Sequence, residues 1–433
     1  MENSLNFTKK TIKDINLQGK TVLLRADYNV PLTKDGRIGD DYRIKKSLPT
    51  IEYLIKQNCK IVICSHLGRP DGKRNLDFSL ASVAKQLGKL LDNRVYFVAD
   101  TIGDTVKKSV EHLKQGEVLL LENLRFYPGE ESNDKDFAKQ LASLADVFVE
   151  DGFGIVHRAH ASTEGVTHYL PSVAGLLLEK EVATINQVLI KPQRPLMAIV
   201  GGAKVSDKIE ILEKFIKLAD IVVVGGAMAN TFLKAKGIDI AKSLSAPEDV
   251  PLAKDIMRQA EIEAKKRQFT FYLPQDSVVA NKIDKTAKTR IVDWDAHVFA
   301  TLENYPNRPP REAGKLKTDE IILDIGPFSG AFIAGSMQMV NTVVWNGTMG
   351  VTETPAIDGP VGPFAHGTEI VIEALMGEFG HRPFSLIGGG DTSGYIEERG
   401  LVDCFDHVST GGGASLDLLA GKKLPGLEAL KDK

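Results

Sequence analysis

Short apolar runs rich in β-branched residues alternate with segments of helical periodicity almost from the start of this sequence. Such runs form strands that are buried on both faces, and the helices between them can cover both faces of a parallel sheet. In the first half the expected strands are "TVLLRADYN", "KIVICSHLG", "RVYFVAD", "EVLLLENL" and "DVFVEDGFG". The helices expected between them span residues 43–57, 80–91, 106–113 and 136–144.

A second series of the same kind follows residues 174–189, which are predicted to form one long helix. A further helix is expected to begin at Ser206, and the strands are "LMAIVGG", "DIVVVGGAM", "FTFYLPQ", "EIILDIGP", "NTVVWNG", "FSLIGGGDT" and "CFDHVSTGGG". A chain of 433 residues exceeds what one hydrophobic core usually organises. The sequence therefore predicts an α/β protein with two doubly wound parallel-sheet (Rossmann-like) domains joined by the long helix.

Composition narrows the possible partners and the compartment. A net charge of −3 argues against a broad nucleic-acid surface. The sequence has no N-terminal signal-like stretch and no run of eighteen apolar residues, so we expect neither secretion nor a membrane span. Three cysteines, none in a C-x-x-C pair, are typical of buried thiols in a reducing compartment. We therefore expect a cytoplasmic protein that binds neither nucleic acid nor membrane.

In a parallel α/β sheet, ligands bind beyond the carboxyl ends of the strands, and in the first half these ends are rich in cations. A single arginine there would more often pair with a neighbouring acid, but four or more indicate a phosphate or carboxylate site. Arg43, at the start of the first helix, joins this set. The polar residues at the strand ends are Arg25, Asp27, Asn29, His66, Arg69, Arg125, His157, Arg158 and His160.

His157 and His160 could form half of a metal site. The sequence offers no cysteine or third histidine clustered with them, so the usual ligand count of a zinc site is not reached. We therefore favour hydrogen bonding or anion contact by these two side chains over metal binding.

The strand ends of the second half are mostly glycines, which leave backbone N–H groups free at helix N-termini. The stretch "GGAKVSDKIE" is no Walker A loop, but its Lys204 and Lys208 stand where a helix begins. Lysine is disfavoured at that end of a helix unless an anion is present, which favours a phosphate site. Asp391, after the glycines of "GGGDT", could cap a helix or bind Mg²⁺.

Taken together, these segments resemble the phosphoglycerate kinase family over nearly the whole chain. The motifs that carry the resemblance are "RADYNVP", "SHLGRP", "LLLENLRF", "DGFGIVHRAHAS", "GGAKVSDKI", "VVWNG", "GGGDT" and "STGGGASLDLLAGKKLPG". The resemblance implies a bilobal, hinge-closing kinase. Such an enzyme transfers the γ-phosphoryl group of MgATP reversibly to the carboxylate of 3-phosphoglycerate, giving ADP and 1,3-bisphosphoglycerate.

The resemblance also implies how the chain divides this work. Residues 1–180 would bind the glycerate, residues 181–413 would bind the nucleotide, and residues 414–433 would return to the first domain. The protein is expected to be a monomer whose partners are 3-phosphoglycerate and ATP or ADP with Mg²⁺. A carboxylate is already an ionised nucleophile, so the reaction needs positioning and charge stabilisation rather than a general base.

Residue roles follow from the same resemblance. The catalytic group, which would stabilise or guide the moving phosphoryl, comprises Arg43, Lys204, Gly390 and Gly412. The substrate would contact Asp27, Tyr28, Asn29, Arg43, His66, Leu67, Gly68, Arg69, Arg125 and Arg158. The nucleotide would contact Lys204, Lys208, Glu353, Gly389, Gly390, Asp391 and Thr392, with Asp391 as the Mg²⁺ ligand.

One region departs from the family pattern. Thr348 and Thr352 replace a proline and a phenylalanine, and Ile322 stands where the family has glycine, in segments that line its base and ribose pocket. A few apolar contacts give only about 1–3 kcal/mol of selectivity. We therefore predict that ATP and at least one other triphosphate differ by no more than roughly two orders of magnitude in kcat/KM, whereas a rebuilt adenine site would restore a strong preference.

Two other functions stay open at this point. One is a catalytically silent binding protein, and the lysines, Asp391 and Arg43 argue against it. The other is a kinase for a related small carboxylate, which the intact set around His66 and Arg125 disfavours.

Overall fold

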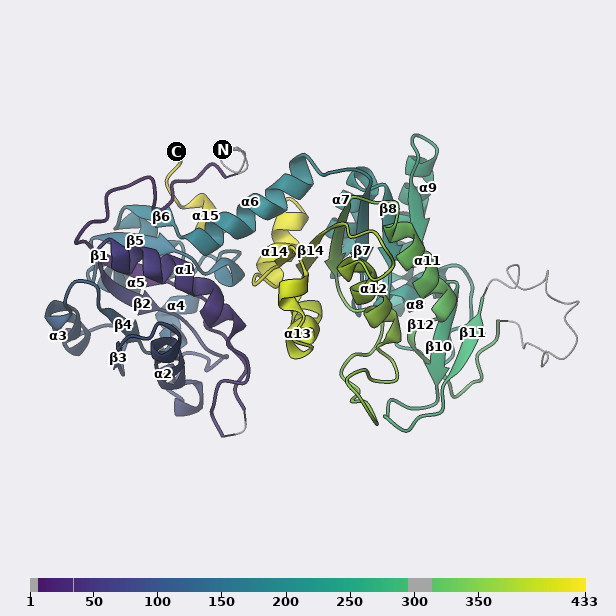
Figure 1. Ribbon diagram of the computed structural model, residues 1–433, viewed down its shortest axis with the longest axis horizontal. Coiled ribbons are helices and arrows are strands. Elements are labelled where there is room, and N and C mark those ends of the chain that lie inside the picture. The colour runs from purple at the N-terminus through teal and green to yellow at the C-terminus, as the bar shows by residue number, and fades with distance from the viewer. Residues whose placement is uncertain (1–6, 34, 295–313) are drawn as a thin grey trace, which may run out of the picture. The chain divides into compact units, whose positions relative to one another are not determined.

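The computed structural model describes residues 7–33, 35–294 and 314–433. They form two compact units, one comprising the residues up to Gln187 together with Thr410–Lys433 and the other comprising Val188–Ser409. Each unit is built around its own parallel sheet, coloured purple to blue in the first and teal through green to yellow in the second (Figure 1). The predicted fold class, two parallel-sheet α/β domains, is confirmed.

The sheet of the first unit has six parallel strands in the order β3-β4-β2-β1-β5-β6. Its strands are β1 (Thr21–Arg25), β2 (Lys60–Cys64), β3 (Val95–Val98), β4 (Val118–Leu121), β5 (Val147–Glu150) and β6 (Ser172–Ala174). The helices between them are α1 (Tyr42–Lys56), α2 (Ala81–Leu90), α3 (Asp104–His112), α4 (Pro128–Glu131) and α5 (Lys135–Ala142). The sequence did not predict the three-residue strand β6.

Burial explains why these apolar runs form a central sheet. Strands β1, β2, β4 and β5 are buried at nearly every residue, as expected where helices cover both faces. Val22, Leu24, Ile61 and Ile63 belong to one hydrophobic cluster on this sheet. Because the strands are parallel, their carboxyl ends lie along one edge, and the polar residues that follow them are brought together there.

The parallel sheet of the second unit has the order β15-β14-β13-β7-β8-β9. Its strands are β7 (Leu196–Val200), β8 (Ile221–Val224), β9 (Thr270–Tyr272), β13 (Thr342–Asn346), β14 (Phe384–Gly388) and β15 (His407–Val408). Its helices are α7 (Ile209–Leu218), α8 (Gly226–Ala235), α9 (Val250–Ala264), α11 (Pro327–Met337), α12 (His366–Met376) and α13 (Gly390–Glu398). The long helix predicted for residues 174–189 is α6 (Leu176–Ile190), which leads from the first unit into the second along the chain.

One strand predicted in the second half forms, but it lies outside the parallel sheet. The stretch "EIILDIGP" forms β12 (Ile321–Ile325), which does not extend the parallel sheet. It belongs to a separate antiparallel sheet, β11-β10-β12, with β10 (Asp276–Ala280) and β11 (Arg290–Asp293). The apolar pattern of a strand shows that it is buried but does not identify its pairing partner, and the short partner β10 was not recognised in the sequence.

The start of α7 was also placed too early. Ser206 is exposed and lies three residues before the first helical residue, Ile209. Its backbone N–H donates to Asp249 Oδ2 at 2.9 Å rather than entering a helical turn. Lys208 therefore occupies the N-cap position of α7, at the end of the helix where backbone N–H groups are free.

The last residues of the chain pack within the first unit as α14 (Gly413–Leu419) and α15 (Pro425–Glu428). Lys433 N donates to Thr8 O at 2.9 Å, and Lys10 N donates to Lys431 O at 2.7 Å, so the two ends of the described chain lie side by side (Figure 1). Among the helices of the described residues, none combines the length and the apolar character that crossing a bilayer requires.

Candidate functional site

The predicted cation-rich edge of the first sheet carries a group of neighbouring polar side chains, which we name the basic cluster: Asp27, Asn29, Arg43, His66 and Arg125. Arg43, on the first turn of α1, donates from Nη1 to Asp27 Oδ2 at 2.5 Å. Asp27 Oδ1 also accepts the backbone N–H of Asn29 at 3.1 Å. Asp27 therefore holds Arg43 in place while the arginine side chain stays 29% exposed and available to an anion.

Gly68 connects the two sides of the basic cluster. Its N–H donates to Asn29 Oδ1 at 2.9 Å, and its carbonyl accepts from Arg125 Nη1 at 2.7 Å. Gly68 has a φ of +63°, and a Cβ at this position would lie 2.3 Å from the Phe78 ring. Both the left-handed backbone and the contact with the ring exclude a side chain, so glycine is required for this connection.

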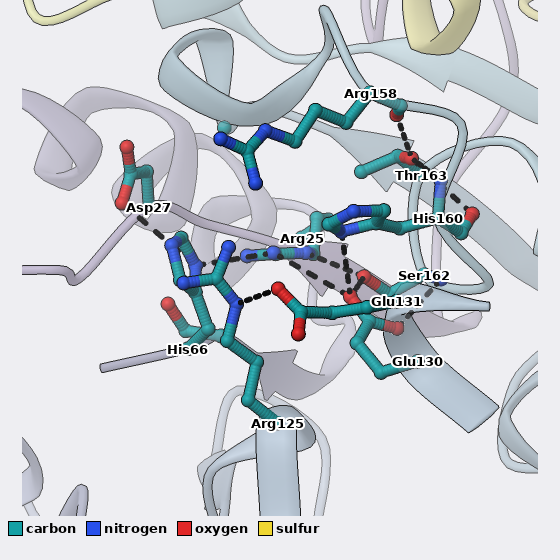
Figure 2. A network of polar contacts seen from close by, with 12 residues as sticks. Arg25, Asp27, His66, Arg125, Glu130, Glu131, Arg158, His160, Ser162 and Thr163 are labelled. Carbon is teal, nitrogen blue, oxygen red and sulfur yellow. Dashed lines mark hydrogen bonds and ion pairs between the residues drawn. The ribbon is translucent and has the colours of Figure 1, made fainter. Parts of the chain in front are cut away.

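A buried network lies behind the basic cluster and is centred on Arg25, the last residue of β1 (Figure 2). Arg25 is 0% exposed, and its Nε donates to Ser162 Oγ at 2.8 Å. Its Nη2 lies 3.2 Å from His66 Nδ1 and 3.9 Å from Glu130 Oε1. Ser162 in turn donates to Glu130 Oε1 at 2.6 Å. The sequence placed Arg25 among the ligand-facing cations, whereas the structure buries it beneath them.

Burial and the neighbouring cations both lower the pKa values of His66 and His160. Burial lowers the pKa of His66 well below its ordinary value, and Arg25, Arg125 and Arg43 lower it further. Burial also lowers the pKa of His160 to about 4, again with Arg25 and Arg125 contributing. The positive charge of the cluster is therefore carried by guanidinium groups, which do not titrate near neutral pH.

Other residues predicted to bind substrate occupy different environments. The side chain of Tyr28 is fully buried and its hydroxyl bonds to Ser47 Oγ at 2.9 Å, while Leu67 is 3% exposed. These two residues support the loops that carry Asp27 and Gly68. Arg69 and Arg158 are exposed, and Figure 2 shows the guanidinium group of Arg158 directed toward the side of the network on which Asp27 and His66 lie.

Sequence reasoning missed the acidic part of the network. Glu130 lies in "YPGEE", a stretch that has the composition of a solvent-exposed turn, yet it is 0% exposed. Its two carboxylate oxygens accept from the Ser162 hydroxyl and backbone N–H. The only signal in the sequence was the short spacing between Glu130 and Arg125 in the segment that follows one predicted strand, and that spacing does not reveal burial.

In the second unit the glycine-rich strand ends approach one another closely. Gly347, after β13, has a φ of +102°, and a Cβ there would lie 2.3 Å from the carbonyl carbon and oxygen of Gly201. Gly201, after β7, donates its N–H to Asn346 O at 2.8 Å, and Gly347 donates to Thr392 Oγ1 at 2.8 Å. The two strand ends and the start of α13 are thereby joined through backbone groups.

The two lysines of "GGAKVSDKIE" differ in environment. Lys204 is exposed, whereas Lys208 is half-buried and its Nζ donates to Asn346 Oδ1. Burial lowers the pKa of Lys208 to about 8, although Asp391 and Asp207 act in the opposite direction. A lysine desolvated in this way, at the N-terminal end of α7, is in a favourable place to bind phosphate oxygens.

Helix α13 begins at Gly390, with Gly389 before it and Asp391 in its first turn. Asp391 is exposed, whereas Thr392 is buried and its Oγ1 accepts the backbone N–H of Gly347. Proteins often hold Mg²⁺ through one or two carboxylates, with substrate phosphates completing its ligands. Asp391 fits this mode, and across residues 7–33, 35–294 and 314–433 no group of three His, Cys, Asp or Glu side chains is placed to hold a metal ion by itself.

A cavity of about 180 Å³ opens beside these elements in the second unit. Its wall is mostly apolar and backbone, with few charged groups, which is typical of a small-molecule pocket. Asp391 and Glu353 lie on its wall, as do Ile322 and Thr348, two of the residues that depart from the family pattern. Of the three altered positions, Ile322 and Thr348 therefore face this cavity, whereas Thr352 is not on its wall.

The glycines of "STGGGASLDLL", Gly411–Gly413, lie within the first unit. Thr410 precedes it and is anchored to the buried Glu181 of α6, whose Oε1 accepts from Thr410 N at 2.7 Å and Thr410 Oγ1 at 2.8 Å. A Cβ on Gly411 would lie 2.3 Å from the Phe153 ring, so the backbone packs tightly against that side chain. Gly412, predicted to be catalytic, stands directly before α14.

Comparison with known proteins agrees with this geometry. The family model described as phosphoglycerate kinase matches residues 12–422. A phosphoglycerate kinase of Moorella thermoacetica is 46% identical over 427 residues, covering 99% of this chain and 100% of that protein. One of Dictyoglomus turgidum is 45% identical over 430 residues, with the same coverage.

Solved structures give the same result. The phosphoglycerate kinase of Coxiella burnetii superposes with a TM-score of 0.79 at 37% identity, covering 97% of this chain and 98% of that one. The enzyme of Pyrococcus horikoshii superposes with a TM-score of 0.79 at 32% identity and the same coverage.

Proposed function

Because the chain belongs to the phosphoglycerate kinase family and is therefore a phosphotransferase, we propose that it moves the γ-phosphoryl group of MgATP reversibly to the carboxylate of 3-phosphoglycerate. The observation that carries this proposal is the basic cluster, in which Asp27 holds Arg43 at 2.5 Å and Gly68 joins Asn29 to Arg125. This arrangement suits a small molecule with two anionic ends and a hydroxyl group between them.

The glycerate would bind to the first unit. Arg125, together with the exposed Arg69 and Arg158, supplies guanidinium groups for its phosphate, since a guanidinium binds phosphate oxygens bidentately. Asp27 and Asn29 would hold the hydroxyl and carboxylate end. Arg43 would lie at the reacting carboxylate and stabilise the charge that develops during transfer.

The nucleotide would bind to the second unit. Lys208 and the backbone N–H groups at the start of α13 would hold its phosphates, and Lys204 would guide the group being transferred. Asp391 would ligate the Mg²⁺ that accompanies the nucleotide, and this ion supplies charge neutralisation to the phosphates. The base and ribose would enter the cavity lined by Ile322, Thr348 and Glu353.

A coupled assay tests the proposal directly. We expect turnover with 3-phosphoglycerate and ATP. If the base pocket is relaxed, that is, weakly selective among bases, kcat/KM for GTP, ITP or UTP should lie within roughly two orders of magnitude of that for ATP. A preference for ATP above a thousandfold would reject the relaxed pocket but not the reaction. Absence of turnover with every nucleotide, together with measurable binding of both ligands, would support the silent binding protein instead. Turnover only with another small carboxylate would identify a different kinase.

The lowered pKa of Lys208 predicts a dependence on pH. Burial lowers the pKa of the Lys208 ammonium group from the ordinary 10.5 to about 8. As the pH rises through about 8, Lys208 therefore loses the positive charge that would bind phosphate. We therefore expect kcat/KM for ATP to fall above this pH, because kcat/KM reports ionisations of the free enzyme. In Lys208→Arg the charge persists and the fall should be absent. A fall that survives in Lys208→Arg would assign it to another group.

We also infer that the protein is cytoplasmic. All three cysteines are free, with Cys59 and Cys64 buried, as suits a reducing compartment.

We further infer that the protein is a monomer. Light scattering during size-exclusion chromatography should give the mass of one chain, 47.2 kDa, and twice that mass would reject the monomer.

A further inference from the structure

The orientation of His66 is set by a group that can only donate hydrogen bonds. Its Nδ1 lies 3.2 Å from Nη2 of Arg25, and a guanidinium group has no acceptor atom. Nδ1 must therefore be the acceptor in this contact and carries no proton. In a neutral imidazole the proton is then on Nε2, the ring nitrogen on the other side.

Arg25 has little freedom to turn away from this contact. It is 0% exposed, and its other nitrogens donate to Ser162 Oγ and to the carbonyl of Ala26. The Ser162 hydroxyl accepts from Arg25 and donates its own proton to Glu130 Oε1 at 2.6 Å. The chain of contacts thus runs from Glu130 through Ser162 and Arg25 to His66, as Figure 2 shows.

The cations around His66 oppose its protonation. Arg25, Arg125 and Arg43 are close enough to disfavour a second positive charge, and His160 acts in the same direction. The acid that faces the ring is Asp27, whose Oδ1 is 4.0 Å from Nδ1 and is already bonded to the backbone N–H of Asn29. Burial of the ring is the largest cause that holds the pKa of His66 well below its ordinary value, and the cations act in the same direction.

We propose that Arg25 is a positioning residue that fixes His66 as the neutral Nε2–H tautomer, so that His66 acts on the substrate as a directed hydrogen-bond donor rather than as a cation. The proposal rests on the proposed function, because the partner of Nε2–H is taken to be an anionic oxygen of 3-phosphoglycerate. Glu130 and Ser162 act one step further away by orienting Arg25.

The tautomer can be read in the ligand-free protein by ¹⁵N NMR of histidine-labelled samples, with the His66 signals assigned by their loss in His66→Gln. We expect Nδ1 to show the shift of an unprotonated nitrogen, Nε2 that of a protonated one, and neither to titrate between pH 6 and 8. A protonated Nδ1, or titration at an ordinary histidine pKa, would overturn the proposal. This measurement needs no turnover, so its failure is distinct from a failure of the proposed function.

A matched pair of variants tests the consequence for substrate binding. Glutamine can place an amide N–H where Nε2 lies, whereas asparagine places it at the Nδ1 position. We expect KM for 3-phosphoglycerate to stay within about tenfold of wild type in His66→Gln and to rise roughly ten- to hundredfold in His66→Asn, through loss of one hydrogen bond to a charged group. Equal KM values for the two variants would contradict a directed Nε2–H donor.

Arg25 itself is tested by Arg25→Met, and by Ser162→Ala where the first variant does not fold. In either variant the Nδ1 and Nε2 shifts should move toward a mixture of tautomers, and KM for 3-phosphoglycerate should rise with them. A merely structural role for Arg25 would raise KM without changing the tautomer, and that result would reject it as a positioning residue.

Discussion

Replacing Arg43 with alanine should lower kcat by about 10²–10³-fold, with a smaller effect on KM for 3-phosphoglycerate. Arg43 is held by Asp27 Oδ2 at 2.5 Å, and its side chain stays partly exposed at the edge of the basic cluster. A donor that is already fixed in this way stabilises charge that develops only in the transition state. Loss of one such donor typically lowers the rate by about 10²–10³-fold. Steady-state kinetics at saturating MgATP would measure both constants.

Arg37→Ala is the matched control. Arg37 also pairs with an aspartate at 2.5 Å in the first unit, but its side chain is 81% exposed and the pair lies outside the basic cluster. Exposed ion pairs contribute little, so kcat and KM should stay at wild-type values. If Arg43→Ala kept a near-normal kcat and raised only KM, Arg43 would serve ground-state binding instead.

Replacing Gly347 with alanine should destabilise the second unit by about 2–6 kcal/mol, the sum of a strained backbone conformation and a steric clash. Gly347 has a φ of +102°, and the added Cβ would lie 2.3 Å from backbone atoms of Gly201, which cannot move aside as a flexible side chain could. To relieve this clash, the backbone at residue 347 must move, which would disturb the hydrogen bond from its N–H to Thr392 Oγ1 at the start of α13. KM for ATP should therefore rise as well.

Chemical denaturation, monitored by fluorescence, would measure the decrease in the free energy of unfolding. Gly335→Ala is the control. Gly335 lies in α11, and a Cβ there would meet no atom within 4 Å. Alanine at this helical position should stabilise the protein by about 0.5–1 kcal/mol. Similar stability for Gly347→Ala and wild type would show that the strand ends can separate without cost.

Much of the fold could be predicted because its signal is local. Near-continuous apolar runs identified every strand of both parallel sheets except β6, and their alternation with helices identified the architecture. The antiparallel sheet was missed because pairing depends on a distant partner, β10, and the start of α7 was misplaced because Asp249 binds Ser206 from another segment.

The sequence by itself determined which residue types stand at the strand ends, because that depends only on order along the chain. The positions of Asp27, His66 and Arg125 directly after apolar runs were enough to assign all three to the carboxyl edge of one sheet. Only the tertiary structure decided which cations are exposed, because burial depends on what other segments cover. Glu130 and Ser162, from two distant segments, enclose Arg25 and leave it facing His66, whereas Arg69 and Arg158 stay exposed. One arginine thus orients a histidine while the others stay available to an anion, a difference that no local pattern carries.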